Sequence, residues 1–123
     1  MSITEQRISD GGLVEWTSVC DLERLVPDRG VAALIDGHVV ALFRLSSGDL
    51  HAVDNVDPIS GASVMSRGLV GDVGGTATIA SPMYKQRFEL CSGRCLDDDE
   101  KALCVHDVRV VDGVVHVRLS GAP

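Results

Sequence analysis

Short apolar runs separated by glycine-containing turns dominate the chain and predict β-strands. Val31–Ile35 and His38–Phe43 flank Asp36-Gly37, and this dipeptide favours a type I′ turn because both central residues need positive φ. The same pattern recurs near the other end of the chain, in Val108–Val111, Asp112-Gly113 and Val114–Leu119. We therefore expect two antiparallel hairpins, the second of which ends in a strand whose His116 and Arg118 face water.

Further strand-like segments lie between the two hairpins. They are Leu50–Val53, which follows the turn Ser47-Gly48-Asp49, and then Thr76–Ala80 and Gln86–Leu90. One segment, Asp21–Val26, is helix-like, with an acidic start and Pro27 as its end. Seven or more short strands predict an all-β fold of stacked antiparallel sheets, a sandwich or barrel, with one short helix near residues 21–26.

Length and composition indicate one globular domain. The chain has 123 residues, of which 45% are hydrophobic and 24% charged, enough for a single core. Both ends are polar or rich in small residues. We expect residues 1–12 and 120–123 to be flexible tails around a domain spanning residues 13–119.

The charge excludes one class of partner. Eleven Lys and Arg against eighteen Asp and Glu give a net charge of −7, which is unfavourable for binding nucleic acid. No apolar run is long enough to cross a membrane, and the N-terminal residues do not resemble a secretory signal. We expect a cytoplasmic protein, in which the four cysteines are thiols, metal ligands or redox groups more readily than disulfides.

Two segments do not have a strand pattern. Asp54–Ala62 and Ala80–Lys85 each contain a proline with small or polar neighbours, and therefore predict loops at the rim of a sheet. Loops on a rigid β-scaffold often carry function.

The second loop resembles part of a known family. Ser81–Gly93 is similar to the second cluster-binding box of Rieske proteins, Cys-Pro-x-His-Gly-x-x-Phe-x-Leu followed by a turn glycine. Ser81, Tyr84 and Lys85 stand where that box has cysteine, histidine and glycine. Its other positions are matched by Pro82, Phe88, Leu90 and Gly93.

The first loop resembles the first Rieske box, in which Cys-x-His is followed by small residues and Leu-Ser-x-Gly. Asn55–Asp57 lies where the ligands would be, and Met65-Ser66-Arg67-Gly68 matches the end of the box. The segment from Ala52 to Leu90 contains neither cysteine nor histidine. Because a Rieske [2Fe–2S] centre needs two thiolates and two imidazoles, we expect a Rieske-like domain without a cluster, a metal or a catalytic residue.

The whole pattern is similar to the small subunits of NADH-dependent nitrite reductases. Its most specific part is the Lys-Gln-Arg-Phe box at residues 85–88. The resemblance implies an accessory subunit in nitrate assimilation that reduces nothing alone. It also implies a large-subunit partner that carries FAD, an iron–sulfur cluster and sirohaem and reduces nitrite to ammonia with electrons from NADH.

Basic and apolar residues near the two loops are candidates for docking to this partner. They are Arg67, Met83, Tyr84, Lys85 and Arg87. Arginine forks onto carboxylates, and large apolar side chains anchor interfaces. The alternatives are a solvated surface for the charges and, for Met83 and Tyr84, filling of the space that the cluster leaves.

The sequence leaves two other functions open. One is an electron carrier with a non-standard metal centre built from Cys91, Cys95, Cys104 and a histidine, and the other is a stand-alone protein-binding module. Cys91 and Cys95 flank a three-residue turn. The set lacks a recognisable ligand spacing, which favours structural thiols.

Overall fold

The computed structural model describes residues 6–10 and 14–120 and contains two antiparallel sheets. The larger sheet contains, from edge to edge, β1 (Gln6–Asp10), β2 (Val14–Asp21), β10 (Val114–Arg118), β9 (Val105–Val111), β5 (Leu50–Asp54), β4 (His38–Arg44) and β3 (Gly30–Ile35). The smaller sheet contains β6 (Leu69–Val73), β7 (Thr76–Ala80) and β8 (Arg87–Glu89). The predicted all-β class is confirmed.

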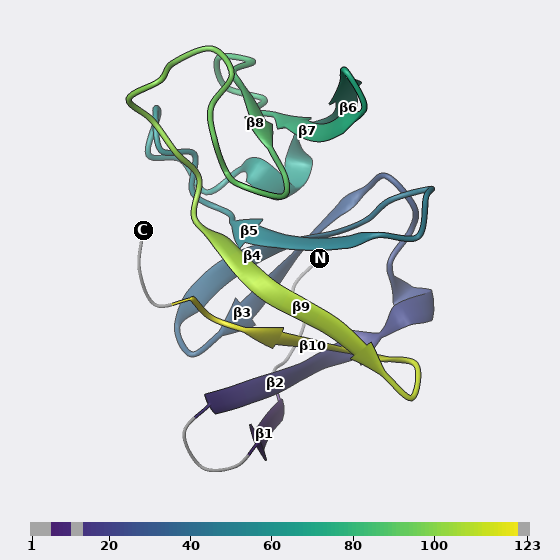
Figure 1. Cartoon of the computed structure of the whole chain (residues 1–123). Helices are drawn as coiled ribbons and strands as arrows, with labels where there is room; N and C mark the ends of the chain where they lie inside the picture. Colours follow the sequence, from purple (N-terminus) through teal and green to yellow (C-terminus); the bar gives the residue numbers. More distant parts are fainter. Residues whose placement is uncertain (1–5, 11–13, 121–123) are drawn as a thin grey trace.

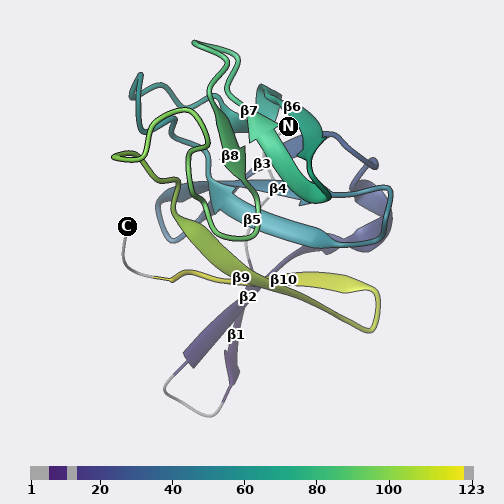
Figure 2. The ribbon, with the colours of Figure 1, turned by 45° about the horizontal axis from the view of Figure 1, so that its top comes forward.

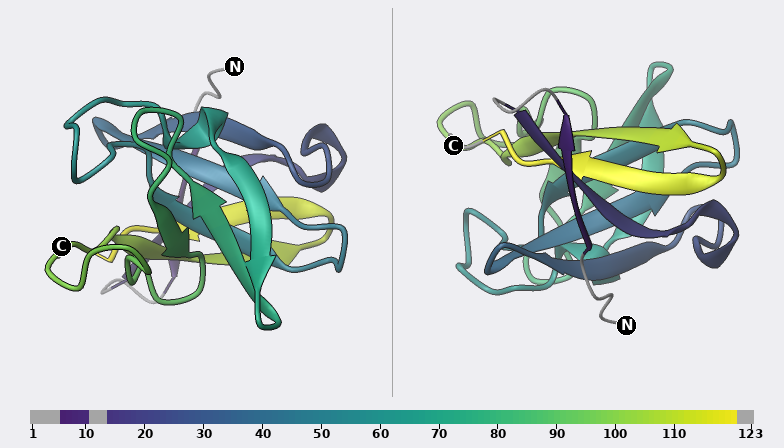
Figure 3. Two further views of the ribbon diagram at one scale, coloured as in Figure 1. Left: turned by 90° about the horizontal axis from the view of Figure 1, so that it is seen from above. Right: turned by 90° about the horizontal axis from the view of Figure 1, so that it is seen from below.

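The strands form stacked layers (Figures 1 and 2). The large sheet curls, so that β2, β9 and β10 lie below β3, β4 and β5, and the small sheet lies above them. Figure 3 shows the small sheet from above and β1, β2 and β10 from below. The β3–β5 layer is therefore covered on both faces.

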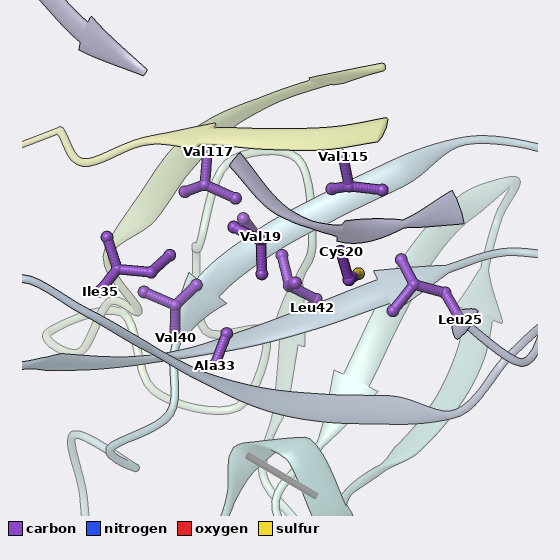
Figure 4. Packing of buried hydrophobic residues seen from close by; sticks show 10 residues of the cluster. Val19, Cys20, Leu25, Ala33, Ile35, Val40, Leu42, Val115 and Val117 are labelled. Atoms are coloured by element: carbon purple, nitrogen blue, oxygen red, sulfur yellow. The ribbon is translucent and has the colours of Figure 1, made fainter. Parts of the chain in front are cut away.

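Strand β4 shows how the sequence produces this arrangement. Successive side chains on a strand point to opposite faces, and Val40 and Leu42 enter the lower core while Ala41 and Phe43 enter the upper one. All four are at most 1% exposed. In Figure 4 the lower core contains Val115 and Val117 of β10 opposite side chains of β3 and β4. A strand with apolar residues on both faces thus belongs to a central layer.

The predicted hairpins are confirmed by their turns. Asp36 and Gly37 have φ of 49° and 80°, and Asp112 and Gly113 have φ of 52° and 78°. Positive φ at both central residues is the requirement of a type I′ turn. Each turn joins strands in the expected antiparallel register.

Several predicted features need correction. The short helix is a single 3₁₀ turn, Leu22–Arg24 (η1), because Asp21 still pairs in β2 and Pro27 follows closely. Gln6–Asp10, assigned from sequence to a flexible tail, forms β1 on the edge of β2. Its sequence gave no strand signal because it lacks an apolar alternation. The rest of that tail, and residues 121–123 of the other, lie outside the described residues.

Two further differences concern strands. The segment Leu69–Val73 forms β6, although it gave no strand signal because it is an edge strand with mainly exposed side chains. His116, expected to face water, is 7% exposed, and β10 has a register shift beside it, between Val115 and His116. Within residues 6–10 and 14–120, no helix combines the length and apolar character needed to cross a bilayer.

Candidate functional site

The first loop leaves β5 at Asp54 and is held at its base by Asn55. The side chain of this buried residue donates from Nδ2 to Ser63 Oγ at 2.8 Å and accepts from the backbone N–H of Ser66 at 2.7 Å. The backbone carbonyl of Asn55 also accepts hydrogen bonds from the backbone N–H groups of Val64 and Met65. Asn55 thereby ties the start of the loop to the 3₁₀ turn Met65–Arg67 (η2).

Asp57 lies two residues further along and is completely buried. Its Oδ1 accepts the backbone N–H of Ile59 at 2.8 Å, and its Oδ2 accepts the hydroxyl of Ser81 at 2.6 Å. Burial raises the pKa of a carboxyl group, but hydrogen bonds from Ser81, Ile59 and Ser60 outweigh it and hold the pKa of Asp57 below its ordinary value. Asp57 is therefore ionised at neutral pH.

The second loop leaves β7 at Ala80 and makes a tight turn. The backbone N–H of Lys85 donates to the carbonyl of Ser81, and the N–H of Ser81 donates to the carbonyl of Gln86. Lys85 closes the turn with φ of 64°, a left-handed conformation that favours glycine. The glycine of the Rieske pattern is thus replaced, but the backbone shape that requires it is kept.

The hydrogen bond between Asp57 and Ser81 joins the two loops in the interior. Both side chains are at most 1% exposed, and Ser81 Oγ also accepts the backbone N–H of Met83 at 3.2 Å. One polar pair therefore fixes the relative position of the loops where the resemblance places cluster ligands.

The docking candidates lie on the second loop and at η2 and β8, close in sequence to the loop residues described above. Met83 and Tyr84 are 47% and 60% exposed, so their side chains do not fill an interior space. Arg67 at the end of η2 and Lys85 are also exposed. The structure thus places two cations and two large apolar side chains on the outer surface of the two loops.

Arg87 has a defined ion-pair partner among the described residues. Its Nη2 donates to Asp97 Oδ1 at 3.0 Å and its Nε to Asp97 Oδ2 at 3.3 Å, while its backbone N–H also donates to Oδ2. This bidentate pair links β8 to the acidic segment 97–100. Arg87 therefore has a structural role in the isolated chain.

The cysteines do not converge on one centre. Cys91 is exposed and Cys95 is buried, and neither belongs to a group of three possible metal ligands among the described residues. Among the described residues, only Asp54, Cys104 and His106 form a group of three His, Cys, Asp or Glu side chains close enough to share a metal ion. The candidate centre built from Cys91, Cys95, Cys104 and a histidine is thus not assembled here.

Comparison with known proteins identifies the family. The model of the Rieske-like [2Fe-2S] domain matches residues 15–118. The nitrite reductase (NADH) small subunit of Salmonella typhimurium is 42% identical over 105 residues, which are 85% of this chain and 97% of that protein. The corresponding small subunit of Escherichia coli K12 is 39% identical, again over 105 residues that cover 85% of this chain and 97% of that protein. The chain belongs to the Rieske-like family of nitrite reductase small subunits.

Other matches extend this family. A crystal structure described as an NADH-dependent nitrite reductase small subunit from Mycobacterium tuberculosis has a TM-score of 0.83 and 46% identity, covering 95% of this chain and 99% of that one. A protein of Klebsiella oxytoca named nitrite reductase [NAD(P)H] large subunit is 41% identical over 102 residues, which are 83% of this chain but 11% of that protein. The small-subunit domain therefore has a homologue inside a much longer chain.

The family model is named for a [2Fe-2S] cluster, but the loop residues of the present chain do not fit such a cluster. A Rieske cluster needs two cysteine and two histidine ligands. The loops present Asn55, Asp57, Ser81 and Tyr84 instead. Asp57 and Ser81 bind each other, Asn55 binds its own loop, and Tyr84 is turned outward. None of these side chains supplies the soft thiolate that such a centre requires.

The Asp57–Ser81 pair was not predicted from the sequence. The two residues are 24 positions apart, and a short polar residue in a proline-containing loop ordinarily indicates a turn. The one signal was their place in the two Rieske boxes, which meet in space in that fold. A pair of polar residues at positions of lost ligands is therefore worth testing as a hydrogen-bonded replacement.

Proposed function

We propose that the chain is the accessory small subunit of a cytoplasmic NADH-dependent nitrite reductase and docks onto the large subunit through its two loops. The observation that carries this proposal is the buried Asp57–Ser81 hydrogen bond, because it joins the two loops that would carry cluster ligands in the Rieske pattern, and its groups transfer no electrons. The loops then present a rigid surface, formed by Arg67, Met83, Tyr84 and Lys85, which we call the loop surface.

The relative from Klebsiella oxytoca supports the identity of the partner. A homologous domain there is part of a chain named as the large subunit. Fusion of two domains keeps them at high effective concentration, which favours pairs that work together. A separate small subunit has to obtain the same proximity by binding.

The composition of the loop surface supports protein docking. Its apolar residues Met83 and Tyr84 offer an anchor of the kind found at interface centres, and Lys85 and Arg67 are cations in a chain of net charge −7. Such local charge steers and orients a complementary acidic surface. Arg87 serves this surface indirectly, because its bonds to Asp97 hold the strand that follows the loop.

Nitrite reduction to ammonia needs six electrons, and cofactors carry such chemistry. We assign FAD, the iron–sulfur cluster and sirohaem to the large subunit, with NADH as the electron donor. The chain itself has no catalytic residue in this proposal. Its contribution is binding, assembly or orientation of the large subunit.

Anaerobic purification of the chain alone and together with its large subunit tests the proposal. Iron and acid-labile sulfide should be absent from the isolated chain, and the two subunits should co-elute with NADH-dependent nitrite reduction in the complex. A stoichiometric cluster on the isolated chain would support an electron carrier instead. Failure of the subunits to associate would support a stand-alone binding module.

A further inference from the structure

A second cluster of chemically active side chains lies away from the loop surface, at the junction of β5 and β9. It contains Asp54 at the end of β5, Cys104 just before β9, and His106 within β9. One ligand atom from each residue lies within 4.8 Å of the others. The function proposed above does not use these residues.

Strand geometry places the three side chains on one face. The pairing of Ala52 with His106 and Val53 with Val105 continues to Asp54 and Cys104, and the backbone N–H of Asp54 donates to the carbonyl of Cys104 at 2.9 Å. Cys104 and His106 are two residues apart, so their side chains point to the same side of the strand. A cross-strand carboxylate thus faces a Cys-x-His pair.

Hydrogen bonds define the tautomer and the orientation of the His106 imidazole in the metal-free chain. The backbone N–H of Ser120 donates to His106 Nδ1 at 3.1 Å, so the ring proton lies on Nε2, which donates to Asp54 Oδ1 at 2.7 Å. Ser120 Oγ is also 3.2 Å from Cys104 Sγ. The ring is therefore held in place, with Nε2 directed at the Asp54 carboxylate.

We propose that Asp54, Cys104 and His106 bind a zinc ion through one carboxylate oxygen, the thiolate and Nε2. Thiolate, imidazole and carboxylate are the ligands that Zn²⁺ uses in proteins. Tetrahedral zinc separates such ligand atoms by about 3.4–3.6 Å, a spacing that small side-chain rotations reach from the observed geometry. A fourth position is left for water or the Ser120 hydroxyl.

Charge and access agree with this assignment. Thiolate and carboxylate together balance the two positive charges of the ion, so the filled site is neutral. The side chain of His106 is 6% exposed and fixed, whereas that of Asp54 is 39% exposed and Cys104 is half-buried. The site therefore combines a buried imidazole with an open route from solvent.

Zinc binding has a defined proton balance. The thiol of Cys104 loses its proton to solvent, and the proton of His106 moves from Nε2 to Nδ1 as Nε2 binds the metal. Nδ1–H no longer accepts the backbone N–H of Ser120, so this hydrogen bond breaks. The metal consequently joins β5 to β9 and releases Ser120 from the imidazole.

Titration of the metal-free chain with Zn²⁺ alone tests this proposal. We expect one equivalent to bind, to raise the melting temperature because it binds the folded state, and to shift the Ser120 amide resonance. Co²⁺ should give thiolate charge-transfer absorption. In the variants Cys104→Ser and Asp54→Asn, affinity should fall at least tenfold, whereas Cys91→Ser, which removes an exposed thiol outside the site, should bind as the parent does.

Circular dichroism of each metal-free variant checks that the fold is kept. The proposal is overturned if the parent chain binds no zinc, if Cys104→Ser binds as tightly as the parent, or if the Ser120 resonance stays unchanged at saturation. If a variant does not fold, the Co²⁺ absorption of the parent chain serves as the test instead. Absence of the thiolate charge-transfer band there also overturns the proposal. These zinc-binding measurements do not depend on binding of the large subunit, so they are independent of the function proposed above.

Discussion

The hydroxyl of Ser81 donates to Asp57 Oδ2 over 2.6 Å, in the interior between two loops that meet from distant parts of the chain. Both side chains are excluded from water, so the charge of Asp57 depends on its hydrogen-bond donors. A buried ionised group is costly unless it is hydrogen-bonded. This pair is therefore the polar crosslink of the loop surface.

Removal of the Ser81 hydroxyl should destabilise the fold. Ser81→Ala removes one hydrogen-bond donor from the buried Asp57 carboxylate, and hydrogen bonds to charged groups contribute about 1.5–3 kcal/mol. We expect the free energy of unfolding in urea to fall by this amount. Ser47→Ala, which removes an exposed hydroxyl 3.4 Å from Asp49, is the matched control and should change it by less than about 0.5 kcal/mol. Equal effects of the two substitutions would contradict a structural role for the pair.

The pH dependence of stability should report the same pair. The folded pKa of Asp57 lies below its ordinary value of about 3.9, so its stabilisation is complete above that pH and is lost as the pH falls through the folded value. The difference in unfolding free energy between the parent and Asp57→Asn should therefore be largest near neutral pH and shrink below about pH 4. Chemical denaturation at several pH values measures this difference, and a constant difference down to acid pH would refute it.

The backbone at Lys85 provides a third prediction. Its φ of 64° is unfavourable for branched side chains and is freely adopted by glycine. Lys85→Val should lower the free energy of unfolding by about 1–2 kcal/mol, whereas Lys85→Gly should keep it within about 1 kcal/mol of the parent. Thermal or urea unfolding of the two variants measures the difference. Equal stability of both variants would show that the turn is not constrained at this position.

Phe88 anchors the small sheet on β4. It is completely buried in the upper core with Phe43, Met65 and Ile79. Phe88→Ala should lower the free energy of unfolding by about 3–5 kcal/mol, because a large cavity is left. Tyr84→Ala, which truncates an aromatic residue that is 60% exposed, should leave stability nearly unchanged. A small effect of Phe88→Ala would indicate that the small sheet packs independently of this ring.

Local sequence patterns predicted the strands whose turns are fixed by neighbouring residues. Asp36-Gly37 and Asp112-Gly113 identified both hairpins because type I′ turns restrict their residues. Strand β6 and the edge strand β1 were missed because backbone pairing holds them and their side chains carry little apolar alternation. Burial of His116 was missed because alternation describes one strand, whereas covering of a sheet face depends on other parts of the chain.

The sequence indicated which loops and residues to consider as the candidate site, but not the interactions within it. The two loops were predicted from their prolines and polar neighbours, and the docking candidates Arg67, Met83, Tyr84, Lys85 and Arg87 are all exposed. Their part in docking stays a prediction. Asp57 and Ser81 are 24 positions apart and Arg87 and Asp97 are 10 positions apart, and each pair lies on two different segments of the fold. No single-sequence rule relates such positions, because their distance is set by the tertiary fold.

The affinity of the chain for its large subunit tests the central claim most directly. Lys85→Glu places a negative charge on the loop surface, and Arg94→Glu makes the same change in net charge at the opposite end of β8, where Arg94 is exposed. Calorimetric titration of the large subunit should show at least a tenfold weaker Kd for Lys85→Glu, or about 1.4 kcal/mol, and an unchanged Kd for Arg94→Glu. Parent-like affinity of Lys85→Glu, or equal loss in both variants, would contradict docking through the loop surface.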